Sequence, residues 1–136
     1  MALRRRRPTD GTSAPGWRPL AALLGVAGVL HLVRPEPFAS IVPRRLGAAT
    51  PWVYGSGAAE LACAAALVAP ATRRTGALAT AALFVAVYPA NVQMAVSALR
   101  SSRATTAYRA VALGRLPLQV PLVLWALRVA RAGERR

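Results

Sequence analysis

The chain has 136 residues, which leaves room for one domain and no more. Hydrophobic residues make up 55% of it, and 18 basic residues, all of them arginine, stand against four acids, for a formal net charge of +14. In a soluble protein this charge would indicate a nucleic-acid binder, but here the arginines lie between apolar runs, as the residues that flank membrane spans do. We therefore expect a lipid bilayer as the chain's surroundings and no nucleic acid as its partner.

The first 16 residues combine the run Arg4–Arg7 with proline, threonine, serine and glycine. We expect residues 1–16 to be a disordered basic tail, because they hold too few apolar residues to fold. The arginine run suits anionic lipid head groups at a cytoplasmic face. The run is not followed directly by an apolar region, so it does not have the form of a cleavable signal peptide.

A first apolar helix is predicted over residues 17–34, with Trp17 and Arg18 as anchors at the membrane interface. Its apolar part is about 22 Å long, so it spans a bilayer core of about 30 Å only if the flanking arginine side chains reach out to water. The proline-rich stretch that follows, up to Thr50, cannot continue the helix. We expect an external loop whose Phe38 and Ile41 lie on the membrane surface.

The second helix, predicted over residues 51–70, carries one acid, Glu60, near its middle. An ionised carboxylate at that depth in lipid is costly enough to require a partner from another helix. Small residues such as Ser56, Gly57 and Cys63 permit another helix to approach closely. Cys63 is the only cysteine, so the chain has no disulfide framework, and we expect this thiol to be a buried packing residue.

The third helix, predicted over residues 75–99, has no charged side chain and about the length that a bilayer requires. Pro89 is expected to kink it, with the amides of Asn91 and Gln93 just beyond. A basic turn at Arg73 and Arg74 precedes it, and a turn this short places the helix antiparallel to the one before.

The fourth helix is predicted over residues 110–130, after a polar loop at 100–109, and residues 132–136 are expected to form a basic C-terminal tail. This helix spans a membrane only if Arg115 lies inside and is paired. The fold class expected for the chain is thus all-α, a transmembrane four-helix bundle. The distribution of arginines favours both termini on the cytoplasmic side of a cell membrane.

Each predicted helix contributes at least one polar group at a similar depth: His31, Glu60, Asn91, Arg115 and Gln119. Counting about 1.5 Å per residue, they fall within roughly two helical turns of one another. The simplest pairing joins Glu60 to Arg115, and the other three complete the hydrogen bonds. The cluster is either a site for a ligand or for protons, or a structural pair that fixes the helix register.

Metal and haem sites are not expected. His31 is the only histidine, so it cannot supply two axial haem ligands, and a zinc site lacks ligands as well. We therefore predict no metal and no cofactor bound by this chain, and His31 is interpreted as a hydrogen-bonding or protonatable group. Tyr54, Tyr88 and Trp125 are expected to be interface and packing aromatics.

Five stretches, from about Leu20 to Leu127, resemble the DoxX family of small bacterial membrane proteins in their order and spacing: GVLHLVRPEPF, IVP, WVYGSGAAELACAAALVAPATRR, YPANVQMA and RLPLQVPLVLWAL. The alanine-rich, all-arginine composition is similar to that of high-GC actinobacterial proteins. The resemblance implies a DoxX-like four-helix transmembrane domain over residues 17–131. It also implies that the five polar residues match the polar positions of the family, as a candidate pocket without established catalytic roles.

Members of that family have been proposed as small subunits of quinone-linked oxidoreductases or as membrane anchors for soluble redox enzymes. The first hypothesis is therefore a quinone- or small-molecule-binding subunit of a membrane oxidoreductase, with electrons supplied by a partner subunit. The alternative is a non-catalytic anchor or assembly platform. A carrier for a small anion is a third hypothesis, although the chain has no detectable inverted repeat. The residues leave open whether the chain is an enzyme and whether it forms a homo-oligomer.

Overall fold

The structure, a computed structural model, describes residues 16–133, and all regular secondary structure in this range is helical. The all-α fold class is thereby confirmed. The helices are α1 (Trp17–Val33), α2 (Glu36–Ala39), α3 (Ala49–Val68), α4 (Arg73–Ala86), α5 (Tyr88–Arg100) and α6 (Thr106–Gly133), and a short 3-10 turn, η1 (Arg44–Leu46), precedes α3. Of the two expected tails, residues 1–15 and 134–136 lie outside the described range.

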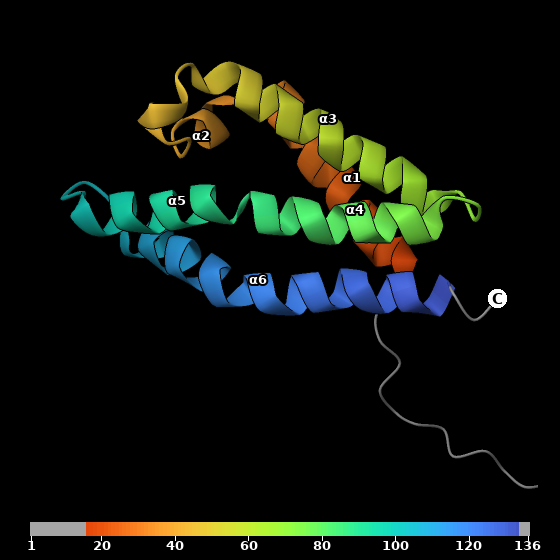
Figure 1. Cartoon of the computed structure of the whole chain (residues 1–136). Helices are drawn as coiled ribbons and strands as arrows, with labels where there is room; N and C mark the ends of the chain where they lie inside the picture. Colours follow the sequence, from red (N-terminus) through yellow and green to blue (C-terminus); the bar gives the residue numbers. More distant parts are fainter. Residues whose placement is uncertain (1–15, 134–136) are drawn as a thin grey trace, which may run out of the picture.

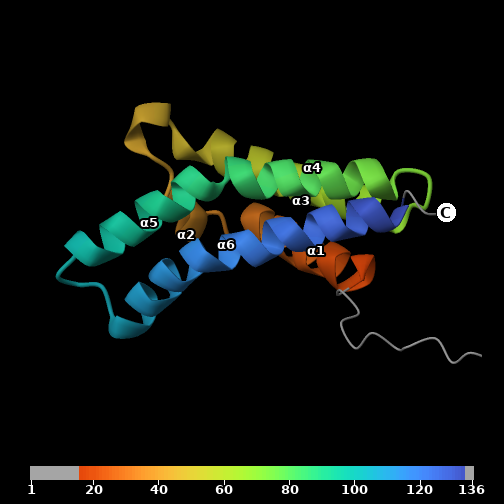
Figure 2. The same ribbon diagram turned by 60° about the horizontal axis from the view of Figure 1, so that its bottom comes forward.

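The long helices pack side by side in the order in which they follow one another along the chain. Helices α4 and α5 follow one another end to end, and α6 runs along both of them. Helix α3 packs on α4, and α1 packs mainly on α3 (Figures 1 and 2). Helix α2 folds back against α3, near the start of that helix.

The single helix expected over residues 75–99 is divided in two at Val87. Pro89 has no backbone N–H to donate to the carbonyl of Val85, and its ring crowds the preceding turn. The Val87 N–H still bonds to the Leu83 carbonyl at 3.0 Å, so α4 ends only there. The break leaves carbonyl groups near the end of α4 that need donors from elsewhere.

Helix α6 is longer than the expected range 110–130, because it begins inside the predicted loop. The hydroxyl oxygen of Thr105 accepts a hydrogen bond from the Tyr108 N–H at 3.1 Å, which satisfies a donor of the first turn. Pro117 and Pro121 lie within α6 without ending it. The helix has 28 residues.

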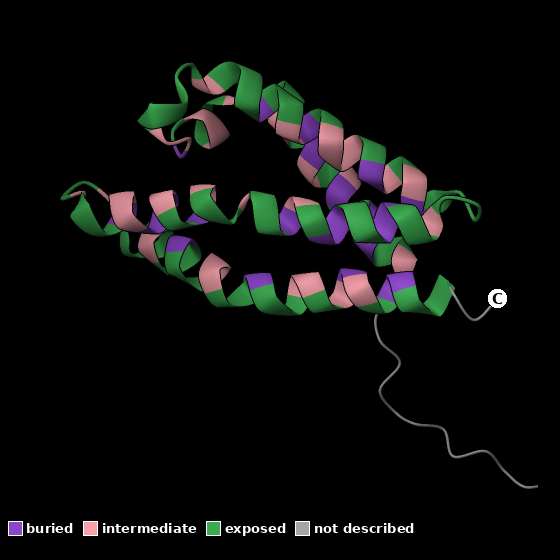
Figure 3. Cartoon of the chain, in the orientation of Figure 1, coloured by how far each residue is buried: buried purple, intermediate pink, exposed green. Residues whose placement is uncertain are grey.

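The interior holds alanines together with large apolar side chains such as Leu20, Leu24 and Leu67, while many other valines and leucines face outward. Figure 3 shows that each long helix has both buried and exposed positions. Ala77, Ala112 and Ala126 are fully buried, whereas Val85 and Val120 are 59% and 62% exposed. Scattered exposed valines are common in soluble proteins, but here 21 large hydrophobic side chains are exposed within the described residues. The outer surface of these helices is therefore suited to apolar surroundings.

Two helical stretches are long and apolar enough to cross a membrane, judged by length and composition alone. These are Arg73–Arg100, which combines α4 and α5, and Thr106–Gly133. Helix α1 is apolar but shorter.

Helices α1 and α3 touch through their backbones at two glycines. A Cβ atom added at Gly28 would lie 2.9 Å from the Gly57 carbonyl oxygen and 2.8 Å from Leu61 Cγ. A Cβ atom added at Gly57 would lie 2.8 Å from the Cβ of His31. Only glycine permits this approach, and close contact of this kind is how helices associate where water supplies no hydrophobic drive.

Arg73 ties the far end of this helix pair together. Its Nε donates a hydrogen bond to the Leu67 carbonyl at 2.8 Å and its Nη2 donates one to the Val68 carbonyl at 3.0 Å, which satisfies two groups at the end of α3. Its guanidinium also lies 4.1 Å from the centre of a Trp17 ring, in a cation–π contact. One side chain therefore joins the start of α1, the end of α3 and the start of α4.

Exchange of Gly28 for alanine tests the α1–α3 contact. Because the new methyl group meets backbone and side chain below 3 Å, we expect a loss of about 1–3 kcal/mol in the free energy of unfolding. Thermal unfolding of the detergent-purified protein measures it. The matched control is Gly25→Ala on the same helix, where an added Cβ has no neighbour within 4 Å, and there we expect no loss. Equal unfolding temperatures for the two variants would contradict the contact.

Candidate functional site

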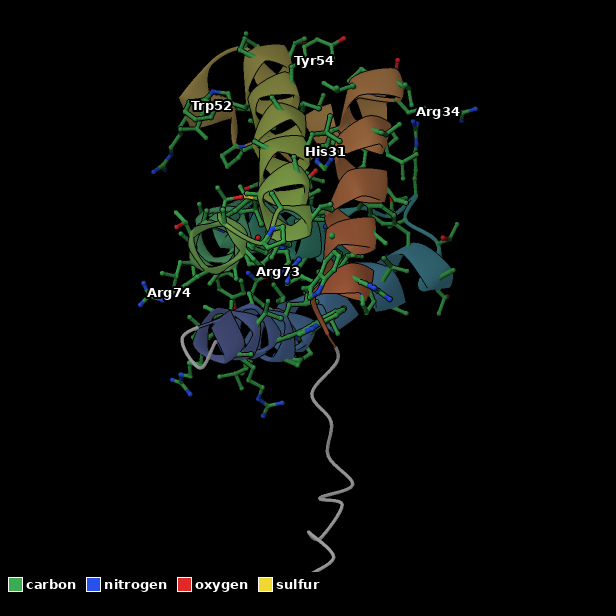
Figure 4. All side chains as sticks on the ribbon, turned by 90° about the vertical axis from the view of Figure 1, so that its right-hand side faces the viewer. His31, Arg34, Trp52, Tyr54, Arg73 and Arg74 are labelled. Atoms are coloured by element: carbon green, nitrogen blue, oxygen red, sulfur yellow. The ribbon has the colours of Figure 1, made fainter. Side chains whose placement is uncertain are left out.

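The α1–α3 contact brings an imidazole and a carboxylate together. His31 lies one helical turn after Gly28, and Glu60 lies one turn after Gly57, so both side chains meet beside the glycine contact. Nδ1 of His31 is 2.9 Å from Oε2 of Glu60, and the two side chains are only 13% and 12% exposed. Figure 4 shows His31 between the two helices.

The contact between these side chains leaves the carboxylate short of a donor. Nδ1 of His31 is also 2.8 Å from the Ala27 carbonyl oxygen, and this nitrogen carries at most one hydrogen. Oε2 of Glu60 is buried and has no hydrogen-bond partner of suitable geometry within residues 16–133. A buried oxygen in this state is costly unless it gains a proton or a donor. The pair is therefore suited to holding a proton or accepting a hydrogen bond from a ligand.

Helix α2 covers the other face of the imidazole. The ring of Phe38 stacks on His31 with centroids 3.7 Å apart and an angle of 26° between the planes. Ile41, just after α2, is buried with Met94 and Ala98 of α5. The expectation that Phe38 and Ile41 lie on the membrane surface is therefore wrong, because both side chains pack against the other helices.

Arg115 does not pair with Glu60, which corrects the predicted ion pair. Among residues 16–133 the His31–Glu60 contact is the one approach of a carboxylate to a cationic group within 4 Å. Helix α3, which carries Glu60, packs on α1 and α4, whereas α6 packs on α4 and α5. The carboxylate of Glu60 therefore contacts His31 of α1 and not Arg115 of α6. Arg115 is partly buried on α6 and lies within electrostatic range of the His31 ring.

The two amides of the predicted cluster form a second group. Asn91 and Gln119 are 5% and 8% exposed. Nδ2 of Asn91 donates to Oε1 of Gln119 at 3.4 Å, and Nε2 of Gln119 donates to the Phe84 carbonyl. Gln119 thus satisfies a carbonyl beside the break that Pro89 causes. The single layer expected from the sequence is therefore two groups, His31 with Glu60 and Asn91 with Gln119.

An open cavity of about 420 Å³ lies beside the second group, between the α4–α5 break and α6. Apolar side chains form most of its wall, and the Gln119 amide and the Tyr88 hydroxyl are the polar groups among its lining residues. From the sequence, Tyr88 was interpreted mainly as an interface or packing aromatic, with stacking on a ligand ring as the alternative. Its position next to Pro89 was the one available signal, because a break in a helix opens space beside it.

Groups that bind metals do not gather in the described part of the chain: no three side chains of the types His, Cys, Asp and Glu come close enough to hold an ion within residues 16–133. Cys63 is buried in a core cluster with Leu67 of α3 and with Ala77 and Ala81 of α4. These contacts fit a packing residue at the interface of α3 and α4.

Comparison with known proteins gives a family match over most of the chain. Residues 20–130 match the model of the family described as Domain of unknown function (DUF8561). No curated protein and no solved structure matches the chain. The matched range includes both polar groups and the cavity beside them.

A double-mutant cycle distinguishes the observed pair from the one predicted from the sequence. His31→Gln and Glu60→Gln should show an interaction energy of about 0.5–3 kcal/mol in thermal or denaturant unfolding, because the side chains touch. The matched cycle, Arg115→Gln with Glu60→Gln, should give a smaller value. A larger interaction energy in the second cycle would restore the ion pair of Glu60 with Arg115.

Proposed function

We propose that the chain, which belongs to the DUF8561 family, is an integral membrane protein that binds a quinone or a similar apolar carbonyl compound. The description of the family names no activity. The observation that carries the proposal is the open cavity with the Gln119 amide in its wall, between two helical stretches that are long enough to span a membrane. The protein would act as a subunit of an oxidoreductase complex.

Membrane placement is supported by the outward-facing valines and by the position of the arginines. In the proposed transmembrane four-helix bundle, the spans are α1, α3, the pair α4–α5, and α6. Basic residues lie near both ends of these helices, at one end Arg18, Arg73, Arg74, Arg128 and Arg131, and at the other Arg34, Arg44, Arg45, Arg100, Arg103 and Arg109. With four spans both termini share a side, and the arginine run of the N-terminal tail favours the cytoplasm.

The cavity has the properties that a quinone requires. Its volume falls in the range of about 300–1,000 Å³ that is usual for small-molecule sites. The Gln119 amide and the Tyr88 hydroxyl can donate hydrogen bonds to carbonyl oxygens. Val85 and Val120, which line the cavity, are more than half exposed, so it opens toward the surrounding lipid. A ligand with an apolar tail would therefore enter from the bilayer.

Reduction of a quinone to a quinol takes two electrons and two protons. A reduced partner subunit would supply the two electrons. The His31–Glu60 pair would deliver one proton to a ring oxygen, and the second proton would come from the aqueous phase. The acid has an oxygen without a donor, and His31 lies against it. Arg115 is partly buried on α6, one turn before Gln119. The resemblance to DoxX proteins agrees with this proposal and stays a prediction.

Filling the cavity tests the proposal. Val120→Phe places a ring in the cavity, and because Val120 is 62% exposed the substitution should cost little stability. A panel of short-chain benzoquinones and naphthoquinones should raise the unfolding temperature of the detergent-purified wild type by mass action, and of this variant much less. The matched control is Val111→Phe, because Val111 is 57% exposed on the same helix and does not line the cavity.

Equal stabilisation of both valine variants would contradict the cavity as the site. If no quinone raises the unfolding temperature of the wild type or of either variant, the alternative of a non-catalytic anchor for a soluble redox enzyme replaces this proposal. Where a quinone does bind, Glu60→Gln separates ligand binding from proton transfer. We expect this variant to bind quinone at the cavity but to lose the activity of the complex. A fully active Glu60→Gln variant would exclude the acid from proton transfer.

A further inference from the structure

A second cavity, of about 510 Å³, lies at the turn between α5 and α6, beside the residue that ends α2. In Figures 1 and 2 this turn is at the opposite end of the molecule from the described end of α6. Its lining differs from that of the first cavity, because it consists of five hydroxyl side chains, one cation and one alanine. The polar members are Ser40, Ser97, Ser101, Arg103, Thr105 and Tyr108.

Three of these hydroxyl groups already accept a hydrogen bond from a nitrogen. The Ser97 oxygen accepts one from Nε2 of Gln93 at 3.2 Å, and the Ser101 oxygen accepts one from the Arg103 backbone N–H at 3.3 Å. The Thr105 oxygen accepts one from the Tyr108 N–H at 3.1 Å. None of the three donates its own hydrogen within residues 16–133. Each therefore keeps an O–H hydrogen to offer to an acceptor in the cavity.

The charge at the cavity is positive. Arg103 is exposed, and its guanidinium makes no hydrogen bond to residues 16–133. The carbonyl groups that would otherwise compete for it are occupied by another arginine, since Nε of Arg109 donates to the Ala98 carbonyl at 3.2 Å and Nη2 donates to that of Ser101 at 2.8 Å. No acidic residue lines the cavity.

We propose that this cavity binds a phosphate-bearing anion, with the Arg103 guanidinium and the hydroxyl groups of Ser97, Ser101 and Thr105 as donors to its oxygens. A phosphate offers several acceptor oxygens at once, and hydrogen bonds from a guanidinium to such oxygens are among the strong ones. The site itself does not depend on quinone binding. In the proposed membrane placement it lies at the end of two spanning segments, at the level of lipid phosphates, so the phosphate is that of a lipid head group or a free ion.

The test uses full-length protein purified and delipidated in an uncharged detergent. Its unfolding temperature is measured against three probes: inorganic phosphate compared with chloride at equal ionic strength, a short-chain phosphatidylglycerol, and the diacylglycerol with the same tails but no phosphate. Arg103→Gln should weaken binding of the phosphate-bearing probe about tenfold. The matched control is Arg100→Gln, which removes the same charge near the same turn outside the cavity lining. Ser97→Ala, which removes one hydroxyl donor, should weaken binding several-fold.

Stabilisation by inorganic phosphate assigns the site to a free anion, and stabilisation by phosphatidylglycerol alone assigns it to a lipid head group. Either result supports the site if the stabilisation is lost in Arg103→Gln and kept in Arg100→Gln. Equal loss in both arginine variants would show only general charge attraction and would overturn the proposal. An equal effect of diacylglycerol, or no stabilisation by any probe, would overturn it too. Quinone binding should be unchanged in Arg103→Gln.

Discussion

The structure depends on close helix contacts at small residues, because many of its large apolar side chains lie on the outside. Where Gly28 and Gly57 meet, two backbones touch, and Gly76 would place a Cβ atom only 2.7 Å from that of Ala66 at the α3–α4 contact. Such contacts gain dispersion energy and need no hydrophobic effect. They suit a chain whose exposed valines face outward, and they determine which polar side chains become neighbours.

Polar groups inside these apolar surroundings follow one rule, that each must find a partner. Arg73 satisfies the end of α3, Arg109 satisfies the end of α5, and Gln119 satisfies a carbonyl beside the Pro89 break. Glu60 departs from the rule, because one of its oxygens is buried without a donor. Within residues 16–133 this is the one buried side-chain oxygen or nitrogen without a hydrogen-bond partner. The proposed proton transfer therefore centres on this acid.

The sequence alone was enough to predict the helical fold, the helix break near Pro89 and the polar positions on each helix, because hydropathy and proline act locally. The ion pair that it predicted for Glu60 with Arg115 is wrong, because the carboxylate meets His31. Counting residues gives the position of a side chain along the helix axis. The rotation of a helix about that axis and the choice of its neighbours depend on contacts such as that of Gly28 with Gly57. The stacking of Phe38 on His31 was missed for the same reason.

The most direct test of the proposed membrane placement is labelling of single cysteines by a membrane-impermeant maleimide, in a Cys63→Ala background. The account predicts that Ser102→Cys, between α5 and α6, is labelled on intact cells, and that Ala71→Cys, between α3 and α4, is labelled only after the cells are opened. Val85→Cys, 59% exposed between them, should resist labelling until detergent is added. Labelling of Val85→Cys in native membranes, or recovery of the protein without membranes, would contradict the account.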